Sequence, residues 1–323
     1  MEKKRIAVVS GGFSGEAQVS MRSAQMVMTH IDRDLYTPTQ VVIETNRWYA
    51  CVGEEQIQID KNDFSFLHLG VQHKFDGVFM IVHGTPGEDG LLQGYFQLMG
   101  IPCTTGDLLN MAVTFNKKAT TDALKNLGYS VAKSKMIREG EGYQVDEIVA
   151  FLGLPCFVKP NNGGSSIGTS KVKQASELSV AIEKAMHEDR QVLIESFIQG
   201  TEVTCGVIQY QGKITPLPLT EIVTENEFFD YQAKYDGASQ EITPARIDAE
   251  MSLRVQNLAA KIYGDLKCAG MIRVDFIIQN GEPHVIEVNT VPGFSEASII
   301  PQQAAVFGIG KKELISTVIQ SCF

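Results

Sequence analysis

The first hundred residues alternate short apolar runs with segments of helical periodicity, and this alternation restricts the possible folds more than any other feature of the sequence. Residues 5–12, RIAVVSGG, are typical of a buried strand that runs into glycines, and residues 16–31 place Val19, Val27 and Ile31 at helical spacing. The next expected elements are two strands, TPTQVVIE and DGVFMIVHG, and one helix closed by a glycine, LLQGYFQLMG. Strands that alternate with helices predict an open, largely parallel α/β sheet in this part of the chain.

A smaller α+β unit is expected next, and it contains a loop rich in glycine and serine. Helix patterns occur in NKKATTDALKNLG, DEIVAFLG and SELSVAIEKAMHED, and strand patterns in VAKSKMI, CFVKP and QVLIESFI. The segment FVKPNNGGSSIGTSKV, residues 157–172, connects two of these strands. Its bare N–H groups, hydroxyls and lysines suit an oxyanion such as phosphate. A flexible surface turn explains the same residues equally well, so the loop by itself leaves both interpretations open.

The rest of the chain is expected to form a third region, with strands at TCGVIQY and KITPLPL, a helix at MSLRVQNLAAKIYGDL and a hairpin at MIRVDFIIQNGEPHVIEVNT. The polar stretch 224–245 is longer than a typical connection and contains aromatic residues, which favours an active-site lid over a disordered insert. We therefore predict three units: an N-terminal α/β domain at 1–105, a central lobe at 106–201, and a C-terminal lobe with the lid at 202–323.

Charge and composition exclude several classes of function. The formal net charge of −10, with scattered lysines, argues against nucleic acid as the main partner. The N-terminal apolar run is too short for a signal-peptide core or a membrane span, so we expect a cytoplasmic protein without membrane insertion. The six cysteines show no CxxC spacing, which predicts neither a zinc site nor a disulfide framework.

The glycines do not match the two familiar nucleotide motifs. A Walker A loop needs lysine directly after its last glycine, whereas Gly168 is followed by Thr169. The segment SGGFSGE lacks GxGxxG spacing, so Asp32, about twenty residues further on, is no evidence for dinucleotide binding. A hydride-transfer enzyme therefore loses its main support in the sequence.

The expected hairpin RVDFIIQNGEPHVIEVN carries two carboxylates and an amide, Asp275, Glu287 and Asn289. A three-residue turn would pair Asp275 with Glu287 and Arg273 with Asn289 on one face. A two-residue Asn-Gly turn would place Glu287 on the opposite face unless a β-bulge corrects the register. Such oxygen ligands suit Mg²⁺, which takes one or two protein carboxylates and completes its shell with substrate phosphates. A solvated polar face with a salt bridge from Arg273 is the alternative.

Six sequence blocks, in order along the chain, resemble the ATP-grasp family, and within it the D-alanine–D-alanine ligases. The blocks are GGFSGEAQVS, HGTPGEDGLLQGYFQLMGIPCTTG, FVKPNNGGSSIGTSKV, VLIESFIQGTEVTCGVI, YQAKY and RVDFII…VIEVNTVPGFSEASIIP. The resemblance covers nearly the whole chain. It implies an α/β N-terminal domain, a two-lobed α+β ATP-grasp domain, and ATP-dependent joining of two D-alanines for peptidoglycan precursors.

For the nucleotide, the resemblance implies contacts from both ATP-grasp lobes. Lys117 and Lys159 would contact the phosphates of ATP, Glu195 and Ile198 would hold the adenine, and Glu202 would bind the ribose hydroxyls. The glycine loop would be a flap over the phosphates. The loop serines and a lid lysine complete the expected nucleotide site: Ser165, Ser166 and Lys234.

For the amino acids, the resemblance implies that Glu16 binds the amino group of the first D-alanine, with His83 nearby. Ser298 would help to bind the carboxylate of the second D-alanine. Tyr235 resembles the lid tyrosine that forms hydrogen bonds with Ser165 and Glu16 in such ligases, a network that is a candidate relay for the amine proton.

For catalysis, the resemblance implies that Asp275, Glu287 and Asn289 bind two magnesium ions, for which manganese can substitute. Arg273 and the N–H group of Gly293 would stabilise negative charge during the reaction. A homodimer is also expected from the resemblance alone.

Each of these residues also has an ordinary structural explanation. Glu16 fits a helix N-terminus, His83 a buried structural histidine, Tyr235 a packing aromatic and Ser298 a helix cap. The two lysines fit surface charges. The joint occurrence of the residues in family order favours the functional interpretation for all but His83 and Ile198.

The sequence departs from the family pattern at three positions, where relatives often carry histidine, glutamate and aspartate: Ala17, Gly163 and Asn116. None is an expected metal ligand, so the departures concern packing around the first substrate. Relatives that join D-alanine to D-lactate have histidine at the lid position of Tyr235, so the tyrosine favours the dipeptide. A non-catalytic nucleotide-binding relative and a ligase for another D-amino or D-hydroxy acid are the rival hypotheses.

Overall fold

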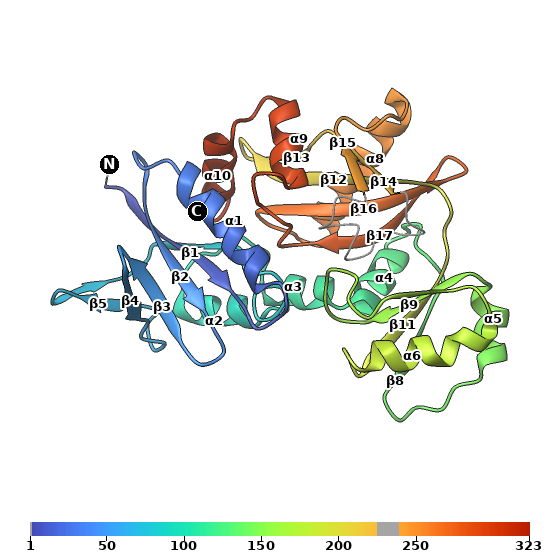
Figure 1. Cartoon of the computed structure of the whole chain (residues 1–323). Helices are drawn as coiled ribbons and strands as arrows, with labels where there is room; N and C mark the ends of the chain where they lie inside the picture. Colours follow the sequence, from blue (N-terminus) through green and yellow to red (C-terminus); the bar gives the residue numbers. More distant parts are fainter. Residues whose placement is uncertain (1, 225–238) are drawn as a thin grey trace.

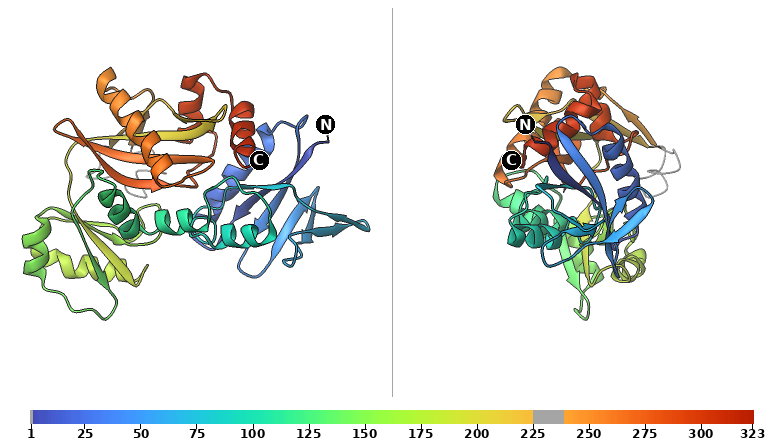
Figure 2. Two further views of the ribbon diagram at one scale, coloured as in Figure 1. Left: turned by 180° about the vertical axis from the view of Figure 1, so that it is seen from behind. Right: turned by 90° about the vertical axis from the view of Figure 1, so that its left-hand side faces the viewer.

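The computed structural model describes residues 2–224 and 239–323, and Figure 1 shows them as two α/β lobes and a C-terminal lobe. Within these ranges the strands form one five-stranded, one four-stranded and one six-stranded sheet, and a separate two-stranded hairpin. Both the front and the rear views place the five-stranded sheet and the four-stranded sheet at opposite ends of the molecule (Figure 2).

The N-terminal sheet has the strand order β4-β3-β2-β1-β7. Its strands are β1 (Lys4–Gly11), β2 (Tyr36–Ile43), β3 (Trp48–Val52), β4 (Glu55–Gln58) and β7 (Gly77–Met80). Only β2, β1 and β7 are parallel, so the expectation of a largely parallel sheet was wrong for β3 and β4. These two strands follow β2 through short turns, which connect antiparallel strands, whereas a parallel pair needs a crossover.

The helix α1 (Ala17–His30) connects the parallel strands β1 and β2. Two further helices, α2 (Leu91–Met99) and α3 (Leu108–Phe115), follow β7 along the chain. Gly100 ends α2 in the left-handed region at φ 66°, as its position predicted. The hairpin of β5 (Phe66–His68) and β6 (Val71–His73) extends from the end of this domain.

The central lobe is a four-stranded antiparallel sheet of order β10-β9-β11-β8. Its elements are α4 (Lys117–Asn126), β8 (Ser134–Arg138), α5 (Val145–Leu152), β9 (Cys156–Pro160), β10 (Ser170–Val172), a 3-10 turn (Ala175–Glu177), α6 (Leu178–Met186) and β11 (Gln191–Ser196). The glycine loop connects β9 to β10, as expected. It therefore leaves the sheet at one end and returns to it beside the same strand.

The C-terminal lobe is built on the six-stranded sheet of order β15-β14-β12-β16-β17, with β13 also paired to β12. Its elements are β12 (Thr201–Tyr210), β13 (Lys213–Pro216), β14 (Thr220–Thr224), β15 (Ser239–Ile242), α8 (Ala249–Asp265), β16 (Met271–Gln279), β17 (Glu282–Asn289), α9 (Ile299–Phe307) and α10 (Lys311–Gln320). Residues 239–242 were expected to belong to the lid, but they pair with β14 as a strand. The rest of the lid sequence, 225–238, lies outside the described residues.

Three apolar cores lie inside these elements. One fills the central lobe, and a second packs α8 against β12 and β16. The third surrounds β1 and also takes in side chains from the end of the chain, including Ile300, Leu314, Ile315, Val318 and Ile319. The helices α9 and α10 therefore join the C-terminal lobe to the N-terminal sheet. The three domain boundaries expected from the sequence stay predictions.

Candidate active site

The hairpin of β16 and β17 combines a two-residue turn with a β-bulge. Gln279 pairs with Glu282, so Asn280 and Gly281 form the turn, both with positive φ (52° and 78°). The pairing shifts between Asp275 and Phe276, and this leaves Ile286 without a partner. Of the two registers that the sequence left open, the structure therefore has the two-residue turn, corrected by the bulge.

Because of this bulge, Asp275 lies opposite Glu287, and Arg273 lies opposite Asn289. Arg273 binds both carboxylate oxygens of Asp275, with Nε 2.8 Å from Oδ1 and Nη2 2.7 Å from Oδ2. Its Nη2 is 3.9 Å from Oε1 of Glu287. The Nδ2 group of Asn289 donates to Asp275 at 3.0 Å and to Glu287 at 3.3 Å. The four side chains thus share one face of the hairpin.

The acidic residues keep Arg273 charged. Burial opposes its charge, but Asp275 and Glu287 outweigh that effect and raise the pKa of Arg273. A buried cation with a planar fork of donors can stabilise an oxyanion or a phosphate without reorganising.

The donor set on this face fits magnesium. Asp275, Glu287 and Asn289 offer two carboxylates and an amide oxygen, the hard ligands that Mg²⁺ takes while keeping positions for water or phosphate. In the described ranges no group of three or more His, Cys, Asp or Glu side chains is placed to hold a metal ion. A metal shell on this face therefore needs the amide and oxygens from a substrate.

Two half-buried lysines of the central lobe, Lys117 and Lys159, interact electrostatically with Glu287 on this face. Lys159 on β9 forms an ion pair with Glu195 on β11, and both side chains are largely buried. Burial opposes the charge on Lys159, yet Glu195 and Glu287 raise its pKa. Burial, together with Lys159, lowers the pKa of Lys117, which Glu287 partly offsets. The charge of Glu287 therefore acts to raise the pKa of both lysines, and the positive charge of the central lobe interacts with the acidic hairpin.

The glycine loop is attached to Lys117 through its backbone. Lys117 Nζ donates to the carbonyl oxygen of Gly163 at 2.5 Å. Gly163, the first of the departures from the family pattern, has φ 113°, a backbone conformation that residues with a side chain rarely adopt. The second departure, Asn116, caps α4 by accepting a hydrogen bond from the N–H of Ala119 at 2.9 Å.

The loop serines face the N-terminal domain. Ser165 and Ser166 both lie in the left-handed region, at φ 52° and 57°. The hydroxyl of Ser165 donates to Oε1 of Glu16 at 2.5 Å. Glu16 precedes α1, but its side chain makes no capping hydrogen bond. Ser165 and Glu16 are thus joined directly, whereas the contacts expected from Tyr235 to both residues lie outside the described residues.

His83, which the sequence assigned only weakly to the site, is a buried structural residue. Its Nδ1 lies 2.8 Å from the carbonyl oxygen of Val291, and its Nε2 lies 3.1 Å from the hydroxyl of Ser23. Ser23 in turn accepts from the N–H of Phe294 at 3.2 Å. Burial lowers the pKa of His83, which fits a neutral ring that donates to Val291 and accepts from Ser23. Through these hydrogen bonds the His83 ring fixes the position of the segment that follows β17.

That segment leads to Gly293 and Ser298. Ser298 stands at the N-cap position of α9, yet its side chain caps no helix N–H. Its hydroxyl accepts from the N–H of Ser295 at 2.8 Å and lies 2.9 Å from the Ser295 hydroxyl. A Cβ atom on Gly293 would lie 3.4 Å from this hydroxyl, so Gly293 and Ser298 are neighbours, as a shared subsite requires.

The remaining expected residues lie between the central and C-terminal sheets or outside the described ranges. Ile198 is buried (8% exposed) in the connection from β11 to β12, and Glu202 is half-buried on β12. Their contacts with adenine and ribose stay predictions. Lys234 and Tyr235 lie outside the described residues.

The comparisons with known proteins decide the family. Residues 5–106 match the family D-ala D-ala ligase N-terminus, and residues 122–320 match the family D-ala D-ala ligase C-terminus. The chain belongs to the D-alanine–D-alanine ligase family. It is 46% identical to a D-alanine–D-alanine ligase of Flavobacterium johnsoniae over 98% of both chains, and 45% identical to one of Phocaeicola vulgatus over 99% of this chain and 100% of the relative.

Solved structures of the same family agree. The VanG D-Ala:D-Ser ligase of Enterococcus faecalis aligns over 100% of both chains with a TM-score of 0.90 at 34% identity. A D-alanine–D-alanine ligase of Bacillus anthracis complexed with ATP aligns over 99% of this chain and 97% of that one, with a TM-score of 0.80 at 28% identity. The expected ATP-grasp fold is confirmed.

Two buried residues of this D-alanine–D-alanine ligase family member were missed in the sequence. Glu88 accepts from the N–H of Gly84 at 2.7 Å and from the N–H of Val291 at 3.3 Å. Burial and the nearby Glu16 raise the pKa of Glu88 to about 8. Thr204 donates to Oδ1 of Asp275 at 2.5 Å. Glu88 lies in a quoted motif, whereas Thr204 is found only once the pairing of β12 with β16 is known.

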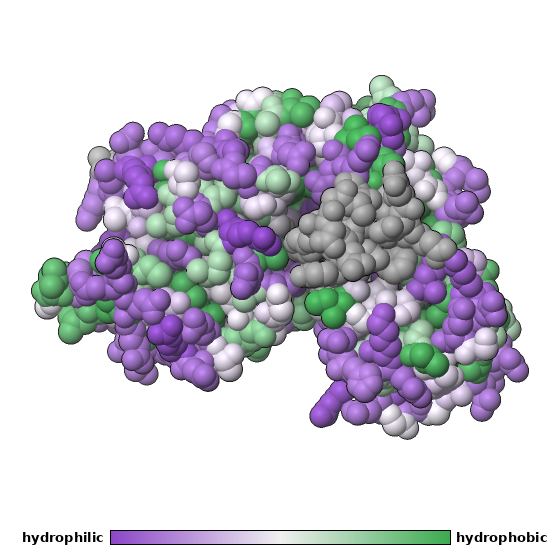
Figure 3. Space-filling model, in the orientation of Figure 1, coloured by the Kyte–Doolittle hydropathy of each residue, from purple (hydrophilic) through white to green (hydrophobic). Residues whose placement is uncertain are grey.

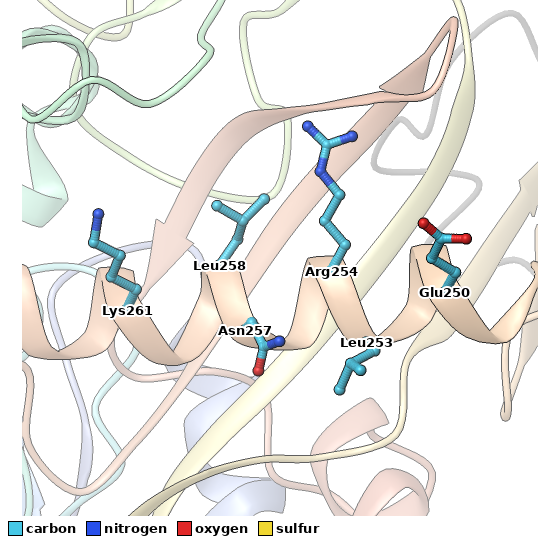
Figure 4. Close-up of a pocket in the computed structure, with 6 residues that line it drawn as sticks. All are labelled: Glu250, Leu253, Arg254, Asn257, Leu258 and Lys261. Carbon is cyan, nitrogen blue, oxygen red and sulfur yellow. The ribbon is translucent and has the colours of Figure 1, made fainter.

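A surface depression on α8 lies apart from the ligase site. Figure 4 shows that its lining side chains project from this one helix: Glu250, Leu253, Arg254, Asn257, Leu258 and Lys261. The guanidinium of Arg254 already has a partner within the protein, because its Nη1 donates a hydrogen bond to the carbonyl oxygen of Gly281 at 2.6 Å. No expected site residue lines this depression. In the part of the chain that the structure describes, no helix has the length and apolar character needed to cross a bilayer.

Proposed function

We propose that this protein joins two molecules of D-alanine to D-alanyl-D-alanine with the hydrolysis of ATP to ADP and phosphate, for the synthesis of peptidoglycan precursors. The observation that carries the proposal is the position of Arg273. Its guanidinium binds Asp275 through two hydrogen bonds beside Glu287, and Glu287 also influences Lys117 and Lys159. This arrangement of cations around a magnesium-type acidic face suits the transfer of a phosphoryl group.

In the first step, the carboxylate of the first D-alanine attacks the γ-phosphorus of ATP, the bond to ADP breaks, and an acyl phosphate forms. Lys117, Lys159 and Arg273 stabilise the negative charge that spreads over the phosphoryl oxygens. Glu16 binds the ammonium group of the first D-alanine, and Ser165 fixes its orientation. Asp275, Glu287 and Asn289 hold two ions of magnesium or manganese, which when bound supply charge neutralisation for the phosphates.

In the second step, the amine of the second D-alanine attacks the acyl carbon, and the bond to phosphate breaks. The N–H group of Gly293 and Arg273 stabilise the oxyanion, while Ser298 binds the carboxylate of the incoming D-alanine. The amine loses a proton, for which Ser165, Tyr235 and Glu16 form the proposed relay. An acyl phosphate is hydrolysed by water, so a glycine loop held by Ser165 serves to exclude water from the site.

The roles of the three units follow from this reaction. Residues 1–105 bind the first substrate, residues 106–201 supply the lysines and the phosphate flap, and residues 202–323 carry the metal site and the lid. The nucleotide lies between the two lobes, with Glu195 and Ile198 at the adenine, Glu202 at the ribose, and Ser166 and Lys234 near the phosphates.

We also propose a cytoplasmic homodimer. The hairpin of β5 and β6 exposes Leu67, Leu69 and Val71, which are 65%, 87% and 57% exposed. Figure 3 shows hydrophobic residues at the same tip of the molecule. Burial of these side chains against a second copy would remove apolar surface from water. Sedimentation of the unmodified protein and of L69E measures the oligomeric state. The variant is expected to dimerise less, because burial of a charged glutamate in the interface is unfavourable.

The test of the reaction is phosphate release from Mg-ATP with D-alanine as the only other substrate, with the product identified by mass. D-alanine-dependent release with a dipeptide product is expected. L-alanine controls for the stereochemistry, and Arg273→Ala, which removes the cation, is expected to abolish the release. ATP binding without D-alanine-dependent release would support a non-catalytic nucleotide-binding protein instead.

A second candidate is a ligase that accepts D-serine as the second substrate. It is favoured by the similarity in fold to the VanG D-Ala:D-Ser ligase, at a TM-score of 0.90. The ratio of kcat/KM for D-alanine, D-serine and D-lactate as acceptors separates the possibilities. A preference for D-alanine supports the first proposal.

A further inference from the structure

Gln303 is a buried polar residue that the proposed mechanism does not use. It lies on α9 and is 0% exposed. Its Oε1 accepts from the N–H of Gly206 at 2.8 Å, and its Nε2 donates to the carbonyl oxygen of Thr204 at 2.9 Å and to the hydroxyl of Thr220 at 3.0 Å. Both donors and the acceptor of the side-chain amide are therefore in use.

The amide of Gln303 fills a gap in the sheet. β12 pairs with β14 as far as Thr204 and with β13 from Val207 onwards, so two residues of β12 lie between the two partners. Gln303 binds the carbonyl group of Thr204, at the start of this gap, and the N–H group of Gly206 within it, where the peptide group of a neighbouring strand would otherwise stand. Without it, buried backbone groups would lose their partners, which costs free energy.

Gly206 allows α9 to approach this closely. A Cβ atom at this position would lie 2.6 Å from Oε1 of Gln303 and 2.6 Å from Cδ1 of Ile300. Both contacts are shorter than side chains tolerate. The sequence therefore combines a glycine on the strand with a glutamine on the helix, and the pair fixes the distance between α9 and β12.

The strand end of this connection leads to Arg273, and the helix end leads to Ser298. On the strand side, Thr204 also binds Asp275 through its hydroxyl, and Arg273 binds the same carboxylate. On the helix side, Ser298 stands at the start of α9, five residues before Gln303, and its hydroxyl is bound to Ser295 and to no helix N–H. The position of Ser298 relative to Arg273 thus depends on where Gln303 places α9.

We propose that Gln303 is a positioning residue for the second substrate: its amide anchors α9 to β12 and so holds Ser298 at the distance from Arg273 that the acceptor amino acid requires. This inference rests on the ligation reaction proposed above and extends it to a residue that touches no substrate. Since Glu16, Ser165 and the lysines lie on other elements, Gln303 affects the second site and leaves the first site and the nucleotide site unchanged.

The experiment compares the unmodified protein with Gln303→Met, which keeps the size of the side chain but removes all three hydrogen bonds. Initial rates of phosphate release over a wide range of D-alanine concentrations give separate KM values for the first and the second D-alanine, and a second series gives the KM for ATP. We expect the KM of the second D-alanine to rise about tenfold, because small displacements of a positioning group weaken binding strongly. The other two KM values stay within about twofold of the unmodified protein.

A matched control separates positioning from general destabilisation. Tyr263→Phe removes another buried hydrogen bond of the same lobe, from the Tyr263 hydroxyl to the carbonyl oxygen of Gly270 at 3.1 Å. It is expected to lower the melting temperature without changing any KM. Should Gln303→Met not fold, Thr220→Val removes one of the three partners of Gln303, together with the hydrogen bond of 2.6 Å between the Thr220 and Thr243 hydroxyls, and is expected to raise the same KM by a smaller factor.

Three results overturn the inference. An unchanged KM for the second D-alanine in a folded variant overturns it and leaves the ligation reaction intact. A parallel change of all three KM values in the variant also overturns it, because that result indicates a general loss of structure. If the unmodified protein releases no phosphate with D-alanine, the proposed reaction fails and the inference fails with it.

Discussion

Ser165 and Glu16 are joined by a hydrogen bond of 2.5 Å, although 149 residues separate them in the sequence. Ser165 adopts φ 52°, a conformation that is unfavourable for a residue other than glycine. Such a conformation persists when surrounding contacts stabilise it. The position of the glycine loop and the orientation of the first-substrate carboxylate therefore depend on each other.

This contact predicts that changes at the two residues are not additive. Ser165→Ala and Glu16→Gln are each expected to lower kcat/KM for D-alanine about a hundredfold, because the first removes the hydroxyl that orients the Glu16 carboxylate and the second removes the carboxylate itself. The kcat/KM of the double variant is expected to be only slightly lower than that of the less active single variant, as for residues that act as a unit. Steady-state kinetics of the four proteins measure this.

Ser170→Ala is the control for the loop. This residue lies at the start of β10, and its hydroxyl accepts from Lys184 at 3.3 Å, away from Glu16. It should leave kcat/KM unchanged. Fully additive losses in the double variant would show that Ser165 and Glu16 act independently.

Glu88 predicts a pH dependence of stability. Burial and the charge of Glu16 raise its pKa from the ordinary value of 4.5 to about 8, with Lys117 acting in the opposite direction. The folded protein therefore binds the proton of Glu88 over a range in which the unfolded chain has released it. This contribution to the free energy of unfolding is present at low pH and is lost as the pH rises towards about 8.

Glu88→Gln removes this titration. Urea unfolding of both proteins at several pH values between about 5 and 9 is expected to show that the variant gains stability relative to the unmodified protein as the pH rises. The comparison of the two proteins cancels the other titrating groups. A constant difference between them across this range would contradict the raised pKa.

The acidic hairpin predicts the metal dependence of activity. Glu287→Gln keeps the shape of the side chain but removes one of two carboxylates, so the Mg²⁺ concentration for half-maximal phosphate release is expected to rise about tenfold or more. Titration of activity with Mg²⁺ and with Mn²⁺ measures the change. Glu282→Gln, in the same hairpin but paired with Arg254, is the control and should leave this concentration unchanged.

Gly270 predicts a large effect on stability. It has φ 64°, and a Cβ atom there would lie only 1.9 Å from the carbonyl oxygen of Thr104. Gly212 has φ 74° but open space around it. Gly212→Ala is expected to cost about 1 kcal/mol from the backbone conformation alone, and Gly270→Ala about 3 kcal/mol, because the contact with Thr104 must also be relieved. Equal losses of unfolding free energy in the two variants, measured by chemical unfolding, would show that the backbone around Gly270 shifts to relieve the contact without a cost in stability.

The residue types of the acidic hairpin could be predicted from the sequence, but their register could not. Alternation along a strand shows which side chains share a face, whereas the bulge at Ile286 depends on the packing of two strands together. For the same reason Thr204 was missed, since its contact with Asp275 exists only across the sheet. Long-range pairing, and not local propensity, decides these positions.

Local signals also explain where the fold was predicted and where it was not. Helix ends marked by glycine, such as Gly100, were found, because a left-handed residue ends a helix. The antiparallel strands β3 and β4 were missed, since their short runs carry little periodicity. Ser298 resembles a helix cap in sequence, and only the structure shows that its hydroxyl binds Ser295 instead.

The packing of α9 and α10 against the N-terminal core has a consequence for the order of events during synthesis. Side chains between Ile300 and Ile319 fill the apolar space around β1, which the ribosome completes some three hundred residues earlier. Until those helices emerge, the nascent N-terminal sheet presents an uncovered apolar face that attracts chaperones. Final closure of the first domain made is thus delayed until residues 300–319 have been synthesised.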